Sequence, residues 1–170
     1  KIELTQSIFD TNMQAISVQD CGQEFLIVTD ALPWTGELSL SASYANHVKN
    51  CARRGMTTPY SVGQLLEMHR IKKGELDSYK YFYTKVSENQ IEGDVYLKKA
   101  GRYLTIYHTS GYDSINESYD RLLEYAEKED LILDSCFYED VILDELSVAG
   151  YENFIIKISV RMLSLQASIW

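Results

Sequence analysis

Residues 136–143 read Cys-Phe-Tyr-Glu-Asp-Val-Ile-Leu, and this stretch alternates as a β-strand does. Side chains two positions apart share one face of a strand, so Phe137, Val141 and Leu143 are expected on the face of Glu139. That face is otherwise apolar and is predicted to be buried. An ionised carboxylate buried without a partner is destabilising. Glu139 therefore needs a protein cation, a raised pKa or a positively charged ligand, unless it lies at a strand end or on a solvated face.

On both sides of this strand, the same order of sequence patterns occurs twice. Runs of β-favouring residues predict strands, and helical spacing of apolar residues predicts helices. In the first half the predicted order is strands at about 12–18 and 23–30, a helix at about 37–53, and strands at about 60–70 and 78–87. In the second half it is a strand at about 101–108, a helix at about 113–128, and strands at about 131–142 and 152–162. The segment Lys72–Glu75 is expected to join two of these strands as a hairpin-like connection.

The order is an internal repeat of β-α-β-β units. Ser43-Tyr44 lies on the first predicted helix as Ser118-Tyr119 lies on the second. Two halves that are each too small to bury a sheet face should pack together. We therefore predict an α+β fold of two pseudosymmetric β-α-β-β units side by side, with a central ligand cleft. The repeats are expected at about 12–90 and 95–165, within a single domain of residues 1–170.

Charge and cysteine content limit the possible partners. Lys and Arg total 16 against 25 for Asp and Glu, a formal net charge of −9, which repels phosphate backbones and anionic lipids. The chain by itself is not expected to bind DNA, and no apolar run approaches the ~18 residues of a membrane span. Cys21, Cys51 and Cys136 are odd in number and widely spaced, which favours reduced thiols in a cytoplasm. The missing initiator Met suggests a fragment.

Motifs for catalysis, metals and nucleotides are missing from the sequence. His47, His69 and His108 are scattered, and neither an HExxH motif, a Walker loop nor a GxGxxG motif occurs. We therefore expect no catalytic residues, no metal and no cofactor. The sequence does hold 13 Tyr against 5 Phe and 2 Trp. Most tyrosines are expected to be boundary residues, but a few around one pocket would suffice to bind a cation through their ring faces.

Several short motifs together resemble a known family. They are Gly101-Arg102-Tyr103, His108-Thr109-Ser110-Gly111-Tyr112, Leu122-Leu123, Phe137-Tyr138-Glu139 and the final strand Ile156–Val160 in the second half, with Ser39–Tyr44 and Thr58-Pro59-Tyr60 in the first. Over about residues 15–162 they are similar to the GyrI-like (SHS2-type) effector-binding domains of BmrR-type multidrug regulators in the MerR family.

That resemblance implies a bacterial, cytoplasmic ligand-sensing domain for lipophilic cationic or aromatic small molecules. It implies that DNA is bound only through an N-terminal domain missing from this chain, that a dimerising coiled coil is also missing, and that the full-length protein is a homodimer. The ligand-binding residues that it implies, together with neighbours on the same motifs, are Glu139, Tyr44, Tyr60, Tyr112, Tyr138 and Phe137. Ser110 stands where BmrR-type domains carry Phe, and either Glu145 or Glu152 could supply a second acidic group.

Two other functions stay open. Some GyrI-like proteins act as hydrolases of electrophilic small molecules, and a Glu with a raised pKa beside a Tyr could activate water. Others bind proteins in the manner of gyrase inhibitors, which would require acidic residues clustered on the outer surface. Sensing is favoured here because no general acid and base can be paired from the sequence.

Overall fold

The computed structural model of the chain describes residues 15–31, 35–56, 61–90, 92–143 and 154–163. Its elements, in chain order, are β1 (Ser17–Cys21), β2 (Glu24–Asp30), α2 (Glu37–Arg53), β3 (Gly63–Glu67), α3 (Met68–Lys72), β4 (Tyr81–Val86), a 3-10 turn η1 (Glu88–Gln90), β5 (Tyr96–Lys98), β6 (Gly101–His108), α4 (Ile115–Lys128), β7 (Ile132–Leu143) and β8 (Ile155–Leu163).

The eight strands of the described residues belong to one sheet, in the order β1-β6-β8-β7-β3-β4-β2-β5. The first repeat contributes β2, β4 and β3, and the second contributes β6, β8 and β7 in the matching order. The repeats meet where β3 pairs antiparallel with β7. The predicted α+β fold of two pseudosymmetric β-α-β-β units is therefore confirmed.

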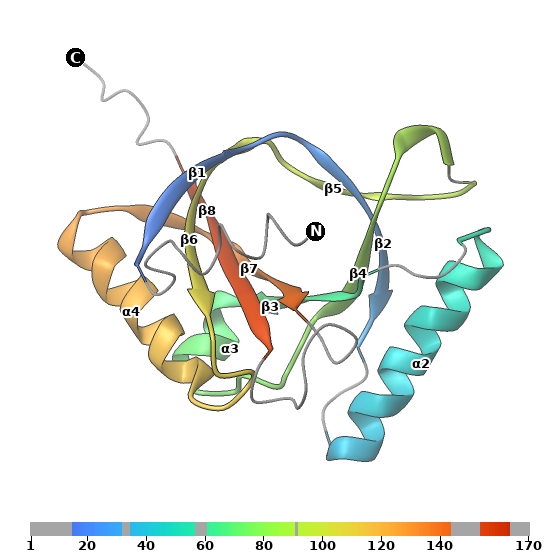
Figure 1. Cartoon of the computed structure of the whole chain (residues 1–170), viewed down its shortest axis with the longest axis horizontal. Coiled ribbons are helices and arrows are strands. Elements are labelled where there is room, and N and C mark those ends of the chain that lie inside the picture. Colours follow the sequence, from blue (N-terminus) through green and yellow to red (C-terminus); the bar gives the residue numbers. More distant parts are fainter. Residues whose placement is uncertain (1–14, 32–34, 57–60, 91, 144–153, 164–170) are drawn as a thin grey trace.

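The sheet curls until its two edges are linked by the chain itself, and α4 and α2 lie outside the curl on opposite sides (Figure 1). In the β1–β6 pair Cys21 lies opposite Gly101, and in the β2–β5 pair Glu24 lies opposite Lys98. The antiparallel pairing therefore continues in the same register from the first pair to the second. β1–β2 and β5–β6 thus form a two-stranded arc that joins the repeats. The sheet consequently has an inner face and a helix-facing outer face.

Two clusters of buried side chains occupy these faces. The larger one lies under the helices and includes Phe82, Tyr119, Leu122, Phe137 and Ile158. The smaller one, on the inner face, is built around Leu26, Leu65, Tyr83, Tyr103 and Tyr138. Because neighbouring strand residues point to opposite faces, Phe137 and Tyr138 belong to different clusters.

The helices attach to the sheet in different ways. In α4 the buried residues are Ile115, Ser118, Tyr119, Leu122 and Ala126, which form one helical face. In α2 the buried residues are Ser43, His47 and Cys51. His47 bonds the hydroxyls of Thr29 and Thr84, at 2.8 Å each. The sheet contact of α2 is therefore largely polar, whereas that of α4 is largely apolar.

Several sequence-based boundaries were wrong. The strand β1 begins at Ser17, and residues 12–14 of the strand predicted there lie outside the described residues. The short strand β5 was missed. Of the strand predicted at about 60–70, only Gly63–Glu67 form β3, because Met68–Lys72 form the helix α3. The connection at Lys72–Glu75 is therefore part of a helix-containing link rather than a simple hairpin. The pairing of β7 with β8 also shifts between Val141 and Leu143, so the alternation through Glu139 does not continue to Leu143.

Candidate functional site

Glu139 lies on the outer face of β7, directly opposite Gln64 of β3 and Ile158 of β8. Its side chain is fully buried. Tyr79 donates a hydrogen bond to Oε1 at 3.3 Å, and Tyr119 donates one to Oε2. Among the residues that the structure describes, no Lys, Arg or His forms an ion pair with this carboxylate. The predicted buried carboxylate is thus present, and its described hydrogen-bond partners are two phenol hydroxyls.

Burial raises the pKa of Glu139 to about 7. Removal from water is the largest cause, because it disfavours the charged form. The hydrogen bonds from Tyr119 and Tyr79 oppose this effect, and the negative charges of Asp77 and Asp140 add to it. The carboxyl group is therefore poised to gain or lose its proton near neutral pH. A bound cation would favour the ionised form.

Aromatic rings extend from the carboxylate toward α2. The Phe82 ring lies 6.0 Å from the Tyr79 ring and 5.9 Å from the Tyr44 ring, measured between centroids. On the other side, the Tyr119 ring meets Phe137 edge to face at 5.6 Å. Tyr44 is 47% exposed. The rings therefore form a row of side-chain contacts from the exposed Tyr44 on α2 to the buried carboxylate.

Tyr112 lies in the loop between β6 and α4. Its hydroxyl and the Gln64 side-chain amide lie 3.3 to 3.5 Å apart, within hydrogen-bonding distance. Burial raises its pKa well above the usual value, and the nearby charge of Glu139 adds to this shift. Gln64, which lies directly opposite Glu139, thus joins Tyr112 to the surroundings of the carboxylate.

The structure brings together four of the six residues expected to bind ligand: Glu139, Tyr44, Tyr112 and Phe137. Tyr138 lies apart from them on the inner face, where its ring is 4.6 Å from the Lys98 ammonium and its hydroxyl is 3.3 Å from that of Tyr96. Tyr60, Glu145 and Glu152 lie outside the described residues.

Three residues around Glu139 were not singled out from the sequence as site residues. Tyr119 was noticed for its helical spacing and its position in the repeat. Tyr79 and Phe82 fell within the strand predicted at about 78–87, and Tyr79 precedes β4 in the structure. The repeat did carry a usable signal, because Tyr44 and Tyr119 occupy corresponding places on the two helices and both belong to the aromatic group around Glu139.

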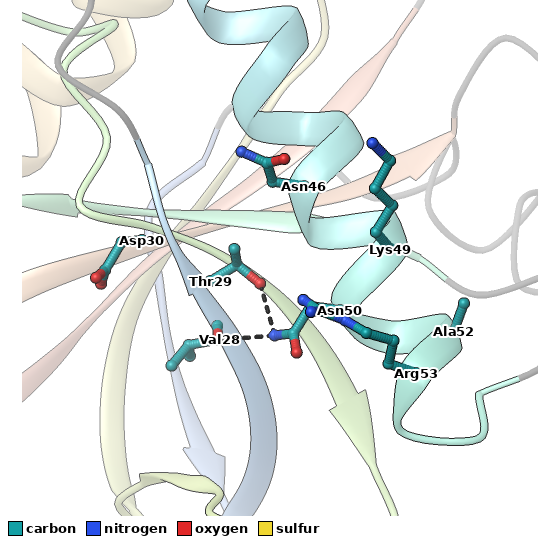
Figure 2. Close-up of a pocket in the computed structure, with 8 residues that line it drawn as sticks. All are labelled: Val28, Thr29, Asp30, Asn46, Lys49, Asn50, Ala52 and Arg53. Atoms are coloured by element: carbon teal, nitrogen blue, oxygen red, sulfur yellow. Dashed lines mark hydrogen bonds between the residues drawn. The ribbon is translucent and has the colours of Figure 1, made fainter.

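Two surface hollows in the described part of the chain lie away from Glu139. One runs between the end of β2 and α2, lined by Thr29, Asn46, Lys49, Asn50 and Arg53 among others (Figure 2). Asn50 donates to Thr29 Oγ1 at 2.9 Å across it, which helps to hold α2 on β2. A second hollow, near Gly63, Tyr83, Lys85 and Asp140, lies at the ends of β3 and β7. Neither is lined by Glu139.

Other functional features were sought in the part of the chain that the structure describes. There, no three His, Cys, Asp or Glu side chains gather closely enough to hold a metal ion. No helix within those ranges is both long and apolar enough to cross a membrane. None of the three cysteines forms a disulfide.

No model of a known protein family matches the chain. The "Multidrug-efflux transporter 2 regulator" of Bacillus subtilis (strain 168) is 24% identical over 162 residues, which cover 95% of this chain. The chain spans 59% of that relative's length. Similarity at this level over nearly the whole chain agrees with the resemblance carried by the motifs.

Solved structures show the same fold. EcmrR in its DNA complex has a TM-score of 0.61 and 14% identity, over 95% of this chain and 63% of its own. The isolated EcmrR C-terminal domain has a TM-score of 0.60, with 13% identity over 88% of this chain and 97% of that domain. A hydrolase from Listeria innocua has a TM-score of 0.54, with 11% identity over 95% and 98% of the two chains.

At these identities the structural likeness establishes the fold alone. The buried Tyr-Glu strand motif, the paired repeats and the match to a multidrug regulator agree with one another. The chain has the fold of the EcmrR C-terminal domain and is similar, over nearly its whole length, to part of the Bacillus subtilis multidrug-efflux transporter 2 regulator.

Proposed function

We propose that this domain senses lipophilic cations by pairing them with Glu139 inside the aromatic group formed by Tyr44, Tyr79, Phe82, Tyr112 and Tyr119. The observation that carries the proposal is that Glu139 is fully buried and is bonded by hydroxyls rather than by a described cation. A carboxylate in such a place is stabilised when a positive charge arrives.

Lipophilic cations fit this site for a physical reason. Their charge is spread over a large apolar body, so they lose little hydration on leaving water. Each aromatic ring that faces the cation adds about 0.5–2 kcal/mol without a strict directional requirement. A site of this kind favours charge and bulk over shape, which agrees with a relative named as a multidrug-efflux regulator.

In the full-length protein, the difference in ligand affinity between two conformations of the domain would bias a DNA-binding domain attached to it. This chain matches 59% of the length of the Bacillus subtilis regulator, and the rest of that relative is long enough to contain such a domain. Tyr60 is retained as a proposed pocket residue because of its motif. Tyr138 is better regarded as part of the inner packing.

Calorimetry with tetraphenylphosphonium tests the proposal, with triphenylphosphine oxide as an uncharged probe of similar bulk. Glu139→Gln should weaken binding of the cation tenfold or more, because it removes one member of a desolvated charge pair. Asp140→Asn is the matched control, since it removes the next carboxylate on the opposite face. Equal affinity of wild type and Glu139→Gln for the cation would exclude this role for Glu139.

A hydrolase is the second candidate. It is favoured by the pKa of Glu139, about 7, together with its two hydroxyl partners, which is the chemistry of a general base. The structural likeness to a hydrolase from Listeria innocua concerns the fold alone. Turnover of reactive esters or cyclopropane electrophiles above the uncatalysed rate, abolished by Glu139→Gln, would place this function ahead of sensing.

A further inference from the structure

Access to Glu139 is closed in this structure. The carboxylate has no exposed surface, and its two hydroxyl partners are nearly as buried: Tyr79 is 9% exposed and Tyr119 is 1% exposed. Both tyrosines also pack in the large cluster under the helices. A ligand that reaches Glu139 must therefore displace a side chain, and moving either of these two would disrupt the core.

Tyr112 is placed differently. It is 38% exposed, although its hydroxyl points inward to the 8% exposed Gln64. It is absent from both buried clusters. Tyr44 is also exposed, but it lies on α2 rather than beside Gln64. Tyr112 is therefore an exposed tyrosine whose tip is held next to β3 by one long hydrogen-bonded contact to Gln64.

The backbone around Tyr112 is fixed. Gly111 has a φ of 61° and donates its N–H to the carbonyl of Phe154 at 3.0 Å. The carbonyl of Asp113 accepts from His108 Nε2 at 2.7 Å. With that proton on Nε2, His108 Nδ1 accepts from Ser118 Oγ at 2.8 Å. The loop is thus bonded on both sides of Tyr112, so rotation of the side chain is the easier motion.

The Tyr112–Gln64 contact also joins the two repeats. Gln64 belongs to β3 of the first repeat and lies directly opposite Glu139, while Tyr112 belongs to the β6–α4 loop of the second. Residues directly opposite each other on paired strands have neighbouring side chains, so this contact holds Tyr112 beside the immediate neighbour of the carboxylate.

We propose that Tyr112 and Gln64 form a side-chain gate over Glu139, and that the opening of this gate sets the rate at which a ligand reaches the carboxylate. The inference rests on the proposed function for its ligand, but the gate itself is a property of the free domain. In this proposal Gln64 controls the entry of ligand to the site, in addition to its place in β3.

Stopped-flow binding of tetraphenylphosphonium to the full chain tests the gate. Tyr112→Phe removes only the hydroxyl, and Gln64→Met keeps the bulk while removing the amide. Each should raise the association rate constant by about three- to tenfold, the equivalent of one modest hydrogen bond. The double variant should gain no more than the larger single effect, because both changes break the same contact.

The chain contains a matched control. Gln19 Nε2 and the Tyr107 hydroxyl form the same kind of contact at 3.4 Å between β1 and β6. Tyr107→Phe and Gln19→Met should leave the association rate unchanged. If Tyr112→Phe and Gln64→Met change only the dissociation rate, the two residues act only on the bound ligand and the gate is refuted.

A second measurement needs no ligand. Glu139→Cys, in a chain where Cys21 and Cys136 are replaced by Ser, places one reactive thiol behind the gate, and the fully buried Cys51 gives the background. A thiol-reactive dye should label it about three- to tenfold faster when Tyr112→Phe or Gln64→Met is added. Faster labelling without cation binding to the wild type would keep the gate and reject the ligand class. Cation binding with unchanged labelling and association rates would overturn the gate and leave the function standing.

Discussion

Gln64 and Glu139 face each other across the β3–β7 ladder, at the place where the two repeats are hydrogen-bonded. Each repeat also supplies one hydroxyl to the carboxylate, Tyr79 from the first and Tyr119 from the second. The charge-bearing group therefore stands at the pseudosymmetry junction, where a ligand can contact both halves at once. A change in the relative position of the halves would alter the surroundings of Glu139. A ligand bound there would in turn favour one relative position of the halves over another.

Cation affinity should depend on pH through Glu139. Its pKa of about 7 means that the carboxyl group is mostly protonated at pH 6, and a monovalent cation must then displace the proton. Below pH 7 the dissociation constant for tetraphenylphosphonium should rise by roughly tenfold per pH unit, and above pH 7 it should level off. Calorimetry in two buffers with different ionisation enthalpies should show proton release at pH 6 and little at pH 8.

Glu139→Gln provides the control for this dependence, because it keeps the shape and removes the titration. Its weaker affinity should be the same at pH 6 and pH 8. A pH dependence that persists in Glu139→Gln would assign the proton to another group.

The unfolding free energy of the domain should also depend on pH through Glu139. Its pKa is higher in the folded protein than in the unfolded chain, where it is near 4.5, so the folded state binds more protons between those values. The contribution of Glu139 is therefore most favourable at low pH and is lost as the pH rises toward 7. The unfolding free energy of Glu139→Gln minus that of the wild type should be higher at pH 8 than at pH 5, by up to about 3 kcal/mol. Urea unfolding of both proteins at the two pH values measures this difference. An equal difference at both pH values would contradict the raised pKa.

His47 should act in the opposite direction. Burial lowers its pKa from 6.5 to about 4, so the unfolded chain binds the extra proton first as the pH falls. The stability that this neutral imidazole contributes is present above pH 6.5 and is lost between pH 6.5 and 4. Replacing His47 with Gln, which can bond both Thr29 and Thr84, should reduce this acid-dependent loss. Urea midpoints measured from pH 7 to pH 4 would check it, and an unchanged pH slope would contradict it.

The sequence predicted the fold well because it is repetitive and strongly patterned. The helices at 37–53 and 113–128 and the strands at 101–108 and 131–142 agree with α2, α4, β6 and β7 to within a few residues. The short elements β5 and α3 were not predicted, because three to five residues are too few for a periodicity to show.

The site was only partly predictable. Period-two alternation placed Glu139 correctly among buried residues, because burial is a local property of a strand. The same rule separates Tyr138 from Glu139, yet the shared motif kept them together as ligand-binding candidates. Tyr79 and Tyr119 reach the carboxylate from 60 and 20 residues away in the chain. Such contacts depend on tertiary packing, which the sequence pattern of each element does not contain.

The two faces of the sheet allow a direct test of which tyrosines belong to the site. Tyr44 is 47% exposed and touches the aromatic group through Phe82, whereas Tyr138 is 5% exposed on the inner face. Tyr44→Leu should weaken tetraphenylphosphonium binding by the worth of one cation–π contact, about 0.5–2 kcal/mol. Its unfolding free energy should change by less than about 1 kcal/mol, because the ring is only half buried.

Tyr138→Leu should behave in the reverse manner. It removes a ring packed edge to face against Tyr83 at 5.8 Å and against Tyr103 at 6.4 Å, together with the hydroxyl contact to Tyr96. Unfolding should become easier by about 2 kcal/mol or more, while the folded variant should bind the cation as the wild type does. Calorimetric affinity and urea unfolding measured on both variants separate the two effects. If Tyr138→Leu lost affinity and Tyr44→Leu did not, the ligand would lie on the inner face of the sheet, and the site around Glu139 would be the wrong one.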